Sequence, residues 1–122
     1  MESKENILQE LNAIEKKHGI RILHAVESGS RAWGFASPDS DYDVRFVYVR
    51  PARDYIRLDE VKDVIMWKDD GILDINGWDL RKAMIQFARG NATLFEWSIS
   101  PVVYKATDDW ASIPMPWYWN LR

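Results

Sequence analysis

The chain has 122 residues, a formal net charge of -3 and no cysteine, and this length is typical of one domain. The lack of cysteine excludes disulfides, zinc–thiolate sites and a cysteine nucleophile, and the acidic balance argues against an overall basic nucleic-acid binder. No apolar run approaches the roughly 20 residues of a membrane span and the first residues lack a signal-peptide core, so we expect a cytoplasmic protein with no membrane partner.

A helix and two strands are predicted in the first part of the chain. Ser3 is expected to cap the helix and Gly19 to end it. Residues 20–28 predict a buried strand, and residues 42–49, rich in β-branched and aromatic side chains, predict a second strand. The helix is indicated by an apolar stripe at helical spacing, formed by Ile7, Leu8, Leu11 and Ile14.

The next part of the chain predicts a β-hairpin, two helices and a short strand. Residues 64–67 and 72–75 flank a polar turn and predict the hairpin. Helices are expected over about residues 79–89 and 93–98, and a last strand over residues 101–104. This order predicts an α/β (α+β) fold in which a small mixed sheet is flanked by helices.

The last residues differ in composition from the rest. We place a main domain at residues 1–105 and a Trp- and Pro-rich tail at residues 106–122, where prolines exclude a regular helix. Exposed aromatic clusters mark interfaces, so the tail is interpreted either as a truncated end or as a contact to a second copy or a partner chain. Three of the seven tryptophans lie in it: Trp110, Trp117 and Trp119.

The most informative segment, residues 29–43, combines a glycine turn with two carboxylates in the pattern GS-x3-G-x5-SDxD. A glycine turn offers backbone N–H groups to phosphates, and Gly29 permits close approach because it has no side chain. Ser30 and the amides after it are expected to bind β- and γ-phosphates, and Gly34 to let the loop turn back. Arg31 fits either a phosphate ligand or a surface charge.

Asp41 and Asp43 stand one residue apart at the start of a strand, so both carboxylates face the same side. Two like charges this close favour a bound cation, and Mg²⁺, or Mn²⁺ in its place, suits oxygen ligands that are shared with substrate phosphates. A third acid from a neighbouring strand would bind a second ion, about 4 Å from the first. Asp74 is our choice because the residues on either side of it are apolar and point to the core. Asp79 is the competing candidate, and it also fits a helix N-cap.

Each half of this pattern taken alone fits a plain turn or a solvated strand end. Their joint spacing favours a site for a nucleoside triphosphate (NTP) with two Mg²⁺ ions. At these residues the chain resembles the nucleotidyltransferases of the DNA polymerase β superfamily, whose signature is hG-[GS], then Dh[DE]h and a later h[DE]h. The matching segments are residues 28–30, 41–44 and 73–75.

A narrower similarity covers residues 29–104 and points to the predicted nucleotidyltransferases associated with RNA repair ligases. Further segments that carry it are Gly77-Trp78-Asp79-Leu80-Arg81-Lys82 and Glu96-Trp97-Ser98 to Ser100-Pro101-Val102. The resemblance implies a polymerase β palm-like fold for residues 1–105. It also implies that Asp41, Asp43 and Asp74 bind the catalytic metal ions and that Gly29 and Ser30 bind the triphosphate.

The reaction implied by the resemblance moves a nucleoside monophosphate from an NTP to an acceptor hydroxyl and releases pyrophosphate. An RNA 3′ end is ranked first as the acceptor, through the narrower group. Two alternatives stay open. One is adenylylation of a protein hydroxyl, as in transferases of toxin–antitoxin pairs. The other is a shortened, non-catalytic nucleotide-binding or regulatory module that acts through the Trp-rich tail, because similar family members continue into a further helical region.

Overall fold

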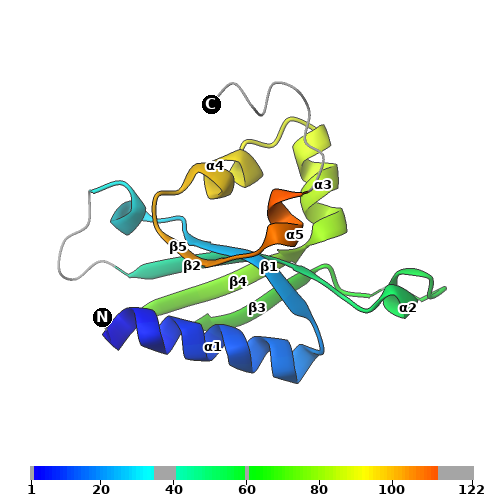
Figure 1. Ribbon diagram of the computed structural model, residues 1–122, viewed down its shortest axis with the longest axis horizontal. Coiled ribbons are helices and arrows are strands. Elements are labelled where there is room, and N and C mark those ends of the chain that lie inside the picture. Colours follow the sequence, from blue (N-terminus) through cyan, green and yellow to red (C-terminus); the bar gives the residue numbers. More distant parts are fainter. Residues whose placement is uncertain (1, 35–40, 60, 113–122) are drawn as a thin grey trace.

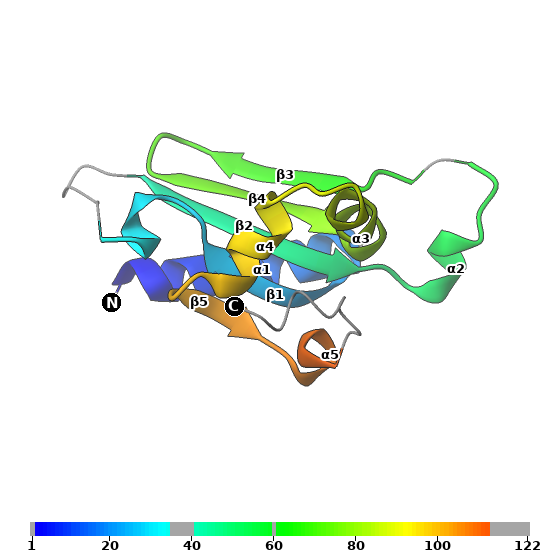
Figure 2. The ribbon, with the colours of Figure 1, turned by 90° about the horizontal axis from the view of Figure 1, so that it is seen from above.

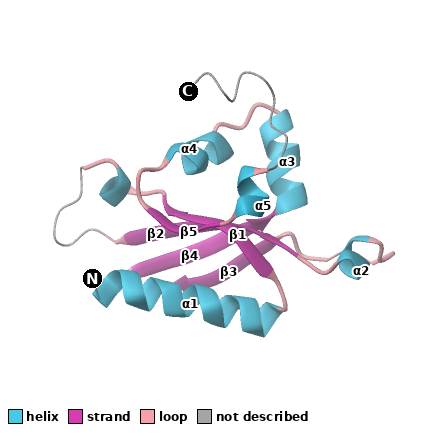
Figure 3. Cartoon of the chain, viewed as in Figure 1, coloured by secondary structure: helices cyan, strands magenta, loops and turns pink. Residues whose placement is uncertain are grey.

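The computed structural model describes residues 2–34, 41–59 and 61–112. Its strands are β1 (Arg21–Glu27), β2 (Tyr42–Val49), β3 (Val64–Asp69), β4 (Leu73–Asp79) and β5 (Val103–Ala106). Its helices are α1 (Glu2–His18), the 3-10 turn η1 (Ser30–Ala32), α2 (Ala52–Tyr55), α3 (Leu80–Ala88), α4 (Thr93–Ile99) and α5 (Asp108–Ala111). The predicted mixed fold is confirmed: the strands form one five-stranded sheet in the order β3-β4-β2-β1-β5, with α1 on one face and α3, α4 and α5 on the other (Figure 1, Figure 3).

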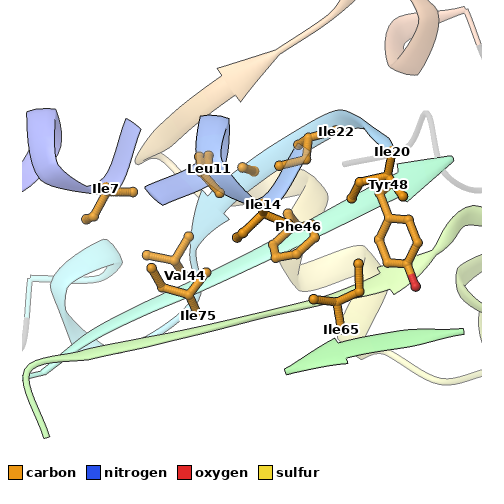
Figure 4. Close-up of a cluster of buried hydrophobic side chains, with 11 residues drawn as sticks. Ile7, Leu11, Ile14, Ile20, Ile22, Val44, Phe46, Tyr48, Ile65 and Ile75 are labelled. Atoms are coloured by element: carbon orange, nitrogen blue, oxygen red, sulfur yellow. The ribbon is translucent and has the colours of Figure 1, made fainter. Parts of the chain in front are cut away.

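The face under α1 holds the larger hydrophobic cluster. The predicted stripe faces it, and the side chains of Ile7, Leu11 and Ile14 are at most 1% exposed. Because α1 begins at Glu2, Ser3 lies inside its first turn, so the N-cap prediction is wrong. An apolar stripe fixes the buried face of a helix but not its first residue. Figure 4 shows the side chains that meet this stripe from the sheet, among them Ile22, Val44, Phe46, Tyr48, Ile65 and Ile75.

The opposite face is covered by α3, α4 and α5. A second cluster there is built from Val26, Val47, Ala83, Phe87, Leu94 and Trp97. Trp110 of α5 packs against it, and its ring stacks on the imidazole of His24 with centroids 4.9 Å apart. Helix α5 was not expected. It begins because the side chain of Thr107 accepts a hydrogen bond from the backbone N–H of Trp110, which caps the helix. Residues 113–122 lie outside the described residues.

The sheet contains one parallel pair among the described strands, β2 with β4, and three antiparallel pairs. The predicted hairpin is confirmed as β3 and β4. Strand β4 continues through Asn76 and Gly77 to Asp79, beyond the predicted strand residues 72–75. Gly77 fits there because a Cβ on it would lie 2.3 Å from the ring of Phe46, so the close approach of that ring requires glycine.

The segment between β2 and β3 extends away from the sheet and carries α2 (Figure 2). No helix in the described part of the chain is long and apolar enough to cross a membrane.

Candidate functional site

Three aspartates lie side by side across neighbouring strands at one end of the sheet. The parallel β2–β4 register pairs Asp43 with Asp74, and the antiparallel β3–β4 register pairs Asp74 with Asp69. Directly paired residues project to the same face of a sheet, so the three carboxylates share the face that α3 and α4 partly cover. Asp41 immediately precedes β2 and is exposed.

Asp43 is partly buried and lies among several charged neighbours. Burial raises the pKa of Asp43; the positive charge of Arg45 lowers it, and the negative charges of Asp74, Asp41 and Asp69 raise it further, with a net rise. A carboxyl group in this position gains from a nearby cation. Within the described residues, no three of the Asp, Glu and His side chains are already arranged as a metal-binding group.

Arg45 supplies one positive charge from within the protein. Its Nη2 donates to Asp74 Oδ2 at 3.0 Å, while its Nη1 donates to the backbone carbonyls of Asp74 and Val44, each at 3.0 Å. The two side chains are only 19% and 29% exposed, so this ion pair is not a loose surface contact. Asn76 Nδ2 lies 3.3 Å from the other oxygen, Asp74 Oδ1. The carboxylate of Asp74 is therefore held on both sides.

The glycine turn packs directly onto Asp43. A Cβ on Gly29 would lie 2.2 Å from Asp43 Oδ2, so the carboxylate occupies the place of the missing side chain. Gly29 has ordinary extended backbone, with φ -90°, and it is the close approach that requires glycine here. Ser30 begins the 3-10 turn η1, which ends at Ala32. Gly34 has φ 81°, which suits the reversal expected of it.

Arg31 extends over an aromatic side chain beside the turn. Its guanidinium carbon lies 4.0 Å from the ring centroid of Tyr42, the residue between Asp41 and Asp43. This contact is close enough for a cation–π interaction. Because Tyr42 packs against the cluster under α1, the contact holds the guanidinium on the side of β2 opposite the acids.

Glu27, at the end of β1, joins the turn to the carboxylate strand and was not among the predicted site residues. Its side chain is 0% exposed. Oε2 accepts hydrogen bonds from the backbone N–H groups of Asp43 (2.8 Å) and Gly29 (3.3 Å), and Oε1 accepts one from the hydroxyl of Tyr104 (2.8 Å). Burial raises the pKa of Glu27, and these hydrogen bonds partly offset the rise. The signal in the sequence is an acid at the end of an otherwise apolar strand, immediately before the glycine turn.

Asp79, the competing third acid, lies at the other end of β4. Five residues of strand separate it from Asp74 by about 17 Å. Its side chain accepts hydrogen bonds from the backbone N–H of Arg81 (2.8 Å) and from the hydroxyl of Tyr55 (2.9 Å). It therefore caps α3, and it lines a cavity of about 820 Å³ between α3 and the α2 segment. The geometry favours Asp74 over Asp79 as the neighbour of Asp43, and the metal-binding role of Asp74 stays a prediction.

Arg45 and Asp69 were also missed. Arg45 is two residues after Asp43, so strand alternation alone would have placed it on the acid face. Asp69 looks like a turn charge in the sequence, because nothing local shows that β3 continues as far as that residue.

A mixed five-stranded sheet with a glycine turn set against strand-borne acids is consistent with a polymerase β-like nucleotidyltransferase fold. The chain belongs to the RNA repair pathway DNA polymerase beta family, whose model matches residues 3–113. It is also similar to the uncharacterized protein YcgL of Bacillus subtilis (strain 168), with 50% identity over 101 residues. That match covers 83% of this chain and 39% of the relative, so the chain spans about two fifths of the relative's length. No solved structure gives a significant match.

Proposed function

We propose that this chain carries a nucleotidyl-transfer site in which Asp41, Asp43 and Asp74 bind Mg²⁺ and the turn at Gly29 and Ser30 binds the triphosphate of an NTP. The observation that carries the proposal is the meeting of two separate parts of the motif. Asp43 is paired with Asp74 across the parallel strands, and its carboxylate fills the space beside Gly29.

The residues present fit a divalent cation. Several negative charges act on Asp43, which is partly buried, and their mutual repulsion falls when a cation lies between them. Aspartate oxygens are the ligands that Mg²⁺ and Mn²⁺ prefer. When bound, such ions would activate the attacking hydroxyl and stabilise the departing pyrophosphate. Asp74 would bind an ion while Arg45 remains hydrogen-bonded to the backbone carbonyls of Val44 and Asp74.

The proposed reaction is a substitution at phosphorus. The oxygen of an acceptor hydroxyl forms a bond to the α-phosphorus of the NTP, and the bond from that phosphorus to the bridging oxygen breaks. Pyrophosphate leaves, and the proton of the hydroxyl moves to one of the aspartate carboxylates. The backbone amides at the start of η1, that of Ser30 first, would hold the β- and γ-phosphates. Arg31 would join them by leaving the ring of Tyr42.

We rank an RNA 3′ end first as the acceptor, because the family to which the chain belongs is assigned to an RNA repair pathway. The overall charge of -3 gives this ranking no electrostatic support. A protein hydroxyl is the alternative acceptor. A nucleotide-binding module without transfer, which meets a partner through residues 106–122, is the non-enzymatic alternative.

The test incubates the purified chain with Mg²⁺ or Mn²⁺ and each α-labelled NTP, in the presence of cellular RNA and cellular protein. We expect label to enter RNA, and we expect Asp43→Asn and Asp74→Asn to lower the rate at least about a hundredfold, as the loss of a metal ligand would. Asp79→Asn is the matched control on the same strand. It keeps a side chain that can cap α3, so its rate should stay close to that of the wild type.

Each other outcome has a definite meaning. Label in protein assigns the protein acceptor. Binding of Mg–NTP in a calorimeter without any transfer supports the non-catalytic module. A chain that folds but neither transfers label nor binds any NTP contradicts the proposal. Loss of activity in Asp79→Asn with full activity in Asp74→Asn would replace Asp74 by Asp79 as the third acid.

A further inference from the structure

The end of β1 is attached to the rest of the fold through every polar group of one residue. The backbone N–H of Glu27 donates to the carbonyl of Val102 at 3.0 Å, and its own carbonyl accepts from the hydroxyl of Ser100 at 2.6 Å. Its two carboxylate oxygens accept from Tyr104, Asp43 and Gly29, as described above. A fully buried carboxylate is costly unless its oxygens are hydrogen-bonded, and both oxygens of Glu27 have partners.

These contacts join two parts of the sequence that the nucleotidyl-transfer proposal leaves unconnected. Ser100 and Val102 belong to the Ser-Pro-Val segment between α4 and β5, which lies outside the acid and glycine motifs. On the other side, Glu27 Oε2 lies within hydrogen-bond distance of both halves of that motif, the amide of Gly29 and the amide of Asp43. Ser28 adds a further link, because its N–H donates to the carbonyl of Asp43 at 2.8 Å.

The amide of Gly29 is thus directed into the protein rather than toward a ligand. The amides of Ala32 and Trp33 donate to the carbonyls of Gly29 and Ser30 at 3.0 Å and 3.1 Å. The phosphate-binding role proposed for the turn therefore falls to the amides at the start of η1, that of Ser30 first. Their position relative to the Asp43 carboxylate depends on how firmly Gly29 is held to β2. A site of this kind works only when phosphate donors and metal ligands keep a fixed spacing.

We propose that Glu27 is the positioning residue that fixes the glycine turn against Asp43, and that Tyr104 and the Ser100–Val102 segment hold Glu27 in place for this purpose. The inference rests on the nucleotidyl-transfer proposal for its functional meaning. It assigns to the Ser-Pro-Val segment the task of anchoring the nucleotide site from the opposite edge of the sheet.

The first experiment compares Glu27→Met with Glu27→Gln. Methionine fills the volume but accepts no hydrogen bond, whereas glutamine keeps one oxygen that can accept from both amides. Glu15→Met is the matched control. Glu15 Oε2 also accepts from a backbone N–H of β1, that of Ile22 at 2.8 Å, and Glu15 also binds β5 through Lys105, but at the far end of the strand.

The readouts are the dissociation constants of Mg–ATP and of Mg–tripolyphosphate, with circular dichroism melting curves to show that each variant is folded. We expect Glu27→Met to raise the dissociation constants of both ligands about tenfold, which corresponds to the loss of one good hydrogen bond. The factor should be the same for both ligands, because only their phosphates contact the turn. Glu27→Gln should stay within about threefold of the wild type and Glu15→Met within about twofold. In turnover, the loss should appear in KM more than in kcat.

Amide hydrogen exchange gives a second readout that needs no ligand. Glu27→Met should lose protection at the amides of Gly29 and Asp43 while the amide of Ile22 stays protected, and Glu15→Met should show the reverse. A folded Glu27→Met variant with wild-type protection and wild-type binding would overturn the inference, as would an equal loss of binding in Glu15→Met. If the wild type binds neither ligand, the nucleotidyl-transfer proposal fails, and exchange still decides whether Glu27 holds the turn to Asp43.

Discussion

Asp43 is the residue at which the glycine turn and the row of aspartates meet, and its neighbours shift its pKa in opposite directions. Its carboxylate fills the space that a side chain at position 29 would need. Burial raises the pKa of Asp43, Arg45 lowers it, and the nearby aspartates raise it further. A small change at position 29 should therefore affect the chemistry of the site more than the stability of the fold.

Gly29→Ala tests this directly. The added Cβ would meet Asp43 Oδ2 at 2.2 Å and Asp43 Cβ at 3.1 Å. The carboxylate can rotate away and the Cβ needs only a small shift, so we expect a loss of stability of about 1 kcal/mol together with a loss of Mg–ATP binding. Gly77→Ala is the contrasting variant, because its Cβ would meet the ring of Phe46 at 2.3 Å. A buried ring has little room to move, so Gly77→Ala should cost about 1–3 kcal/mol and leave binding by the folded fraction unchanged.

Urea unfolding and calorimetry measure the two effects separately. Equal binding by Gly29→Ala and the wild type would show that the carboxylate does not need its present position.

At the scale of the elements, strand β4 carries one aspartate near each of its ends. Asp74 near its start belongs to the acid row, and Asp79 at its end caps α3 and accepts a hydrogen bond from Tyr55. One strand thus contributes to the candidate site and to the start of a core helix, with separate residues for each task.

Asp79→Ala removes both hydrogen bonds of this cap. We expect the free energy of unfolding to fall by about 1–2 kcal/mol, with no change in nucleotide binding by the folded protein. Asp79→Asn should recover most of the stability, because asparagine caps helices nearly as well. Denaturant unfolding at neutral pH measures the difference, and a fully stable Asp79→Ala would contradict the capping role.

The elements that local sequence predicts are those with a strong period or a clear turn. The apolar stripe predicted α1, the β-branched run predicted β2, and the polar turn predicted the hairpin of β3 and β4. The short helices α2 and α5 were missed because four residues carry no period. Thr107 with two following acids was the only local sign of α5.

The acids and the glycine turn of the candidate site could be named from their spacing, but the contacts around them could not. The pairing of Asp43 with Asp74 follows from a parallel register between residues 31 positions apart, and no local pattern sets that register. The network of Glu27 depends on Tyr104, 77 positions further along the chain. Such contacts are decided by the packing of the whole domain.

At the scale of the whole molecule, α4 and α5 close the second face of the sheet over a buried histidine. His24 is 6% exposed, stacks on Trp110, and donates from Nε2 to the carbonyl of Trp97 at 3.2 Å. Its Nδ1 is buried and has no hydrogen-bond partner among the described residues. Burial lowers the pKa of His24, and the hydrogen bond to Trp97 offsets this only in part.

This arrangement makes stability depend on pH in a definite direction. The unfolded chain binds a proton near the ordinary pKa of 6.5, whereas the folded chain resists protonation until a lower pH. The stabilisation of the fold by neutral His24 is therefore fully present above pH 6.5. It is lost as the pH falls toward the folded-state pKa, by at most about 1.4 kcal/mol per pH unit for one proton.

His24→Phe should flatten this slope between about pH 6.5 and 5.5, because phenylalanine keeps a ring beside Trp110 and cannot be protonated. His18→Gln is the comparison variant. Partial burial and the charges of Lys17 and Arg50 also lower the pKa of His18, but this residue is exposed at the end of α1, where solvent screens its charge, so its removal should flatten the slope less than His24→Phe does. Thermal melting curves across this pH range measure the slope of stability against pH. An unchanged slope in His24→Phe would contradict the role given to His24.

The parallel register of β2 and β4 has one more consequence. A slip of one residue would turn Asp74 toward α1 and bring Ile75 out of the core, so the pattern that buries the apolar side chains also aligns the acids. The two properties are inherited differently. A descendant of this chain can lose an acid by a single substitution and keep its fold, but it cannot lose the alignment without losing the core. Inactive relatives should therefore be recognisable by altered residues at positions 43 and 74 on an unchanged alternation of buried and exposed side chains.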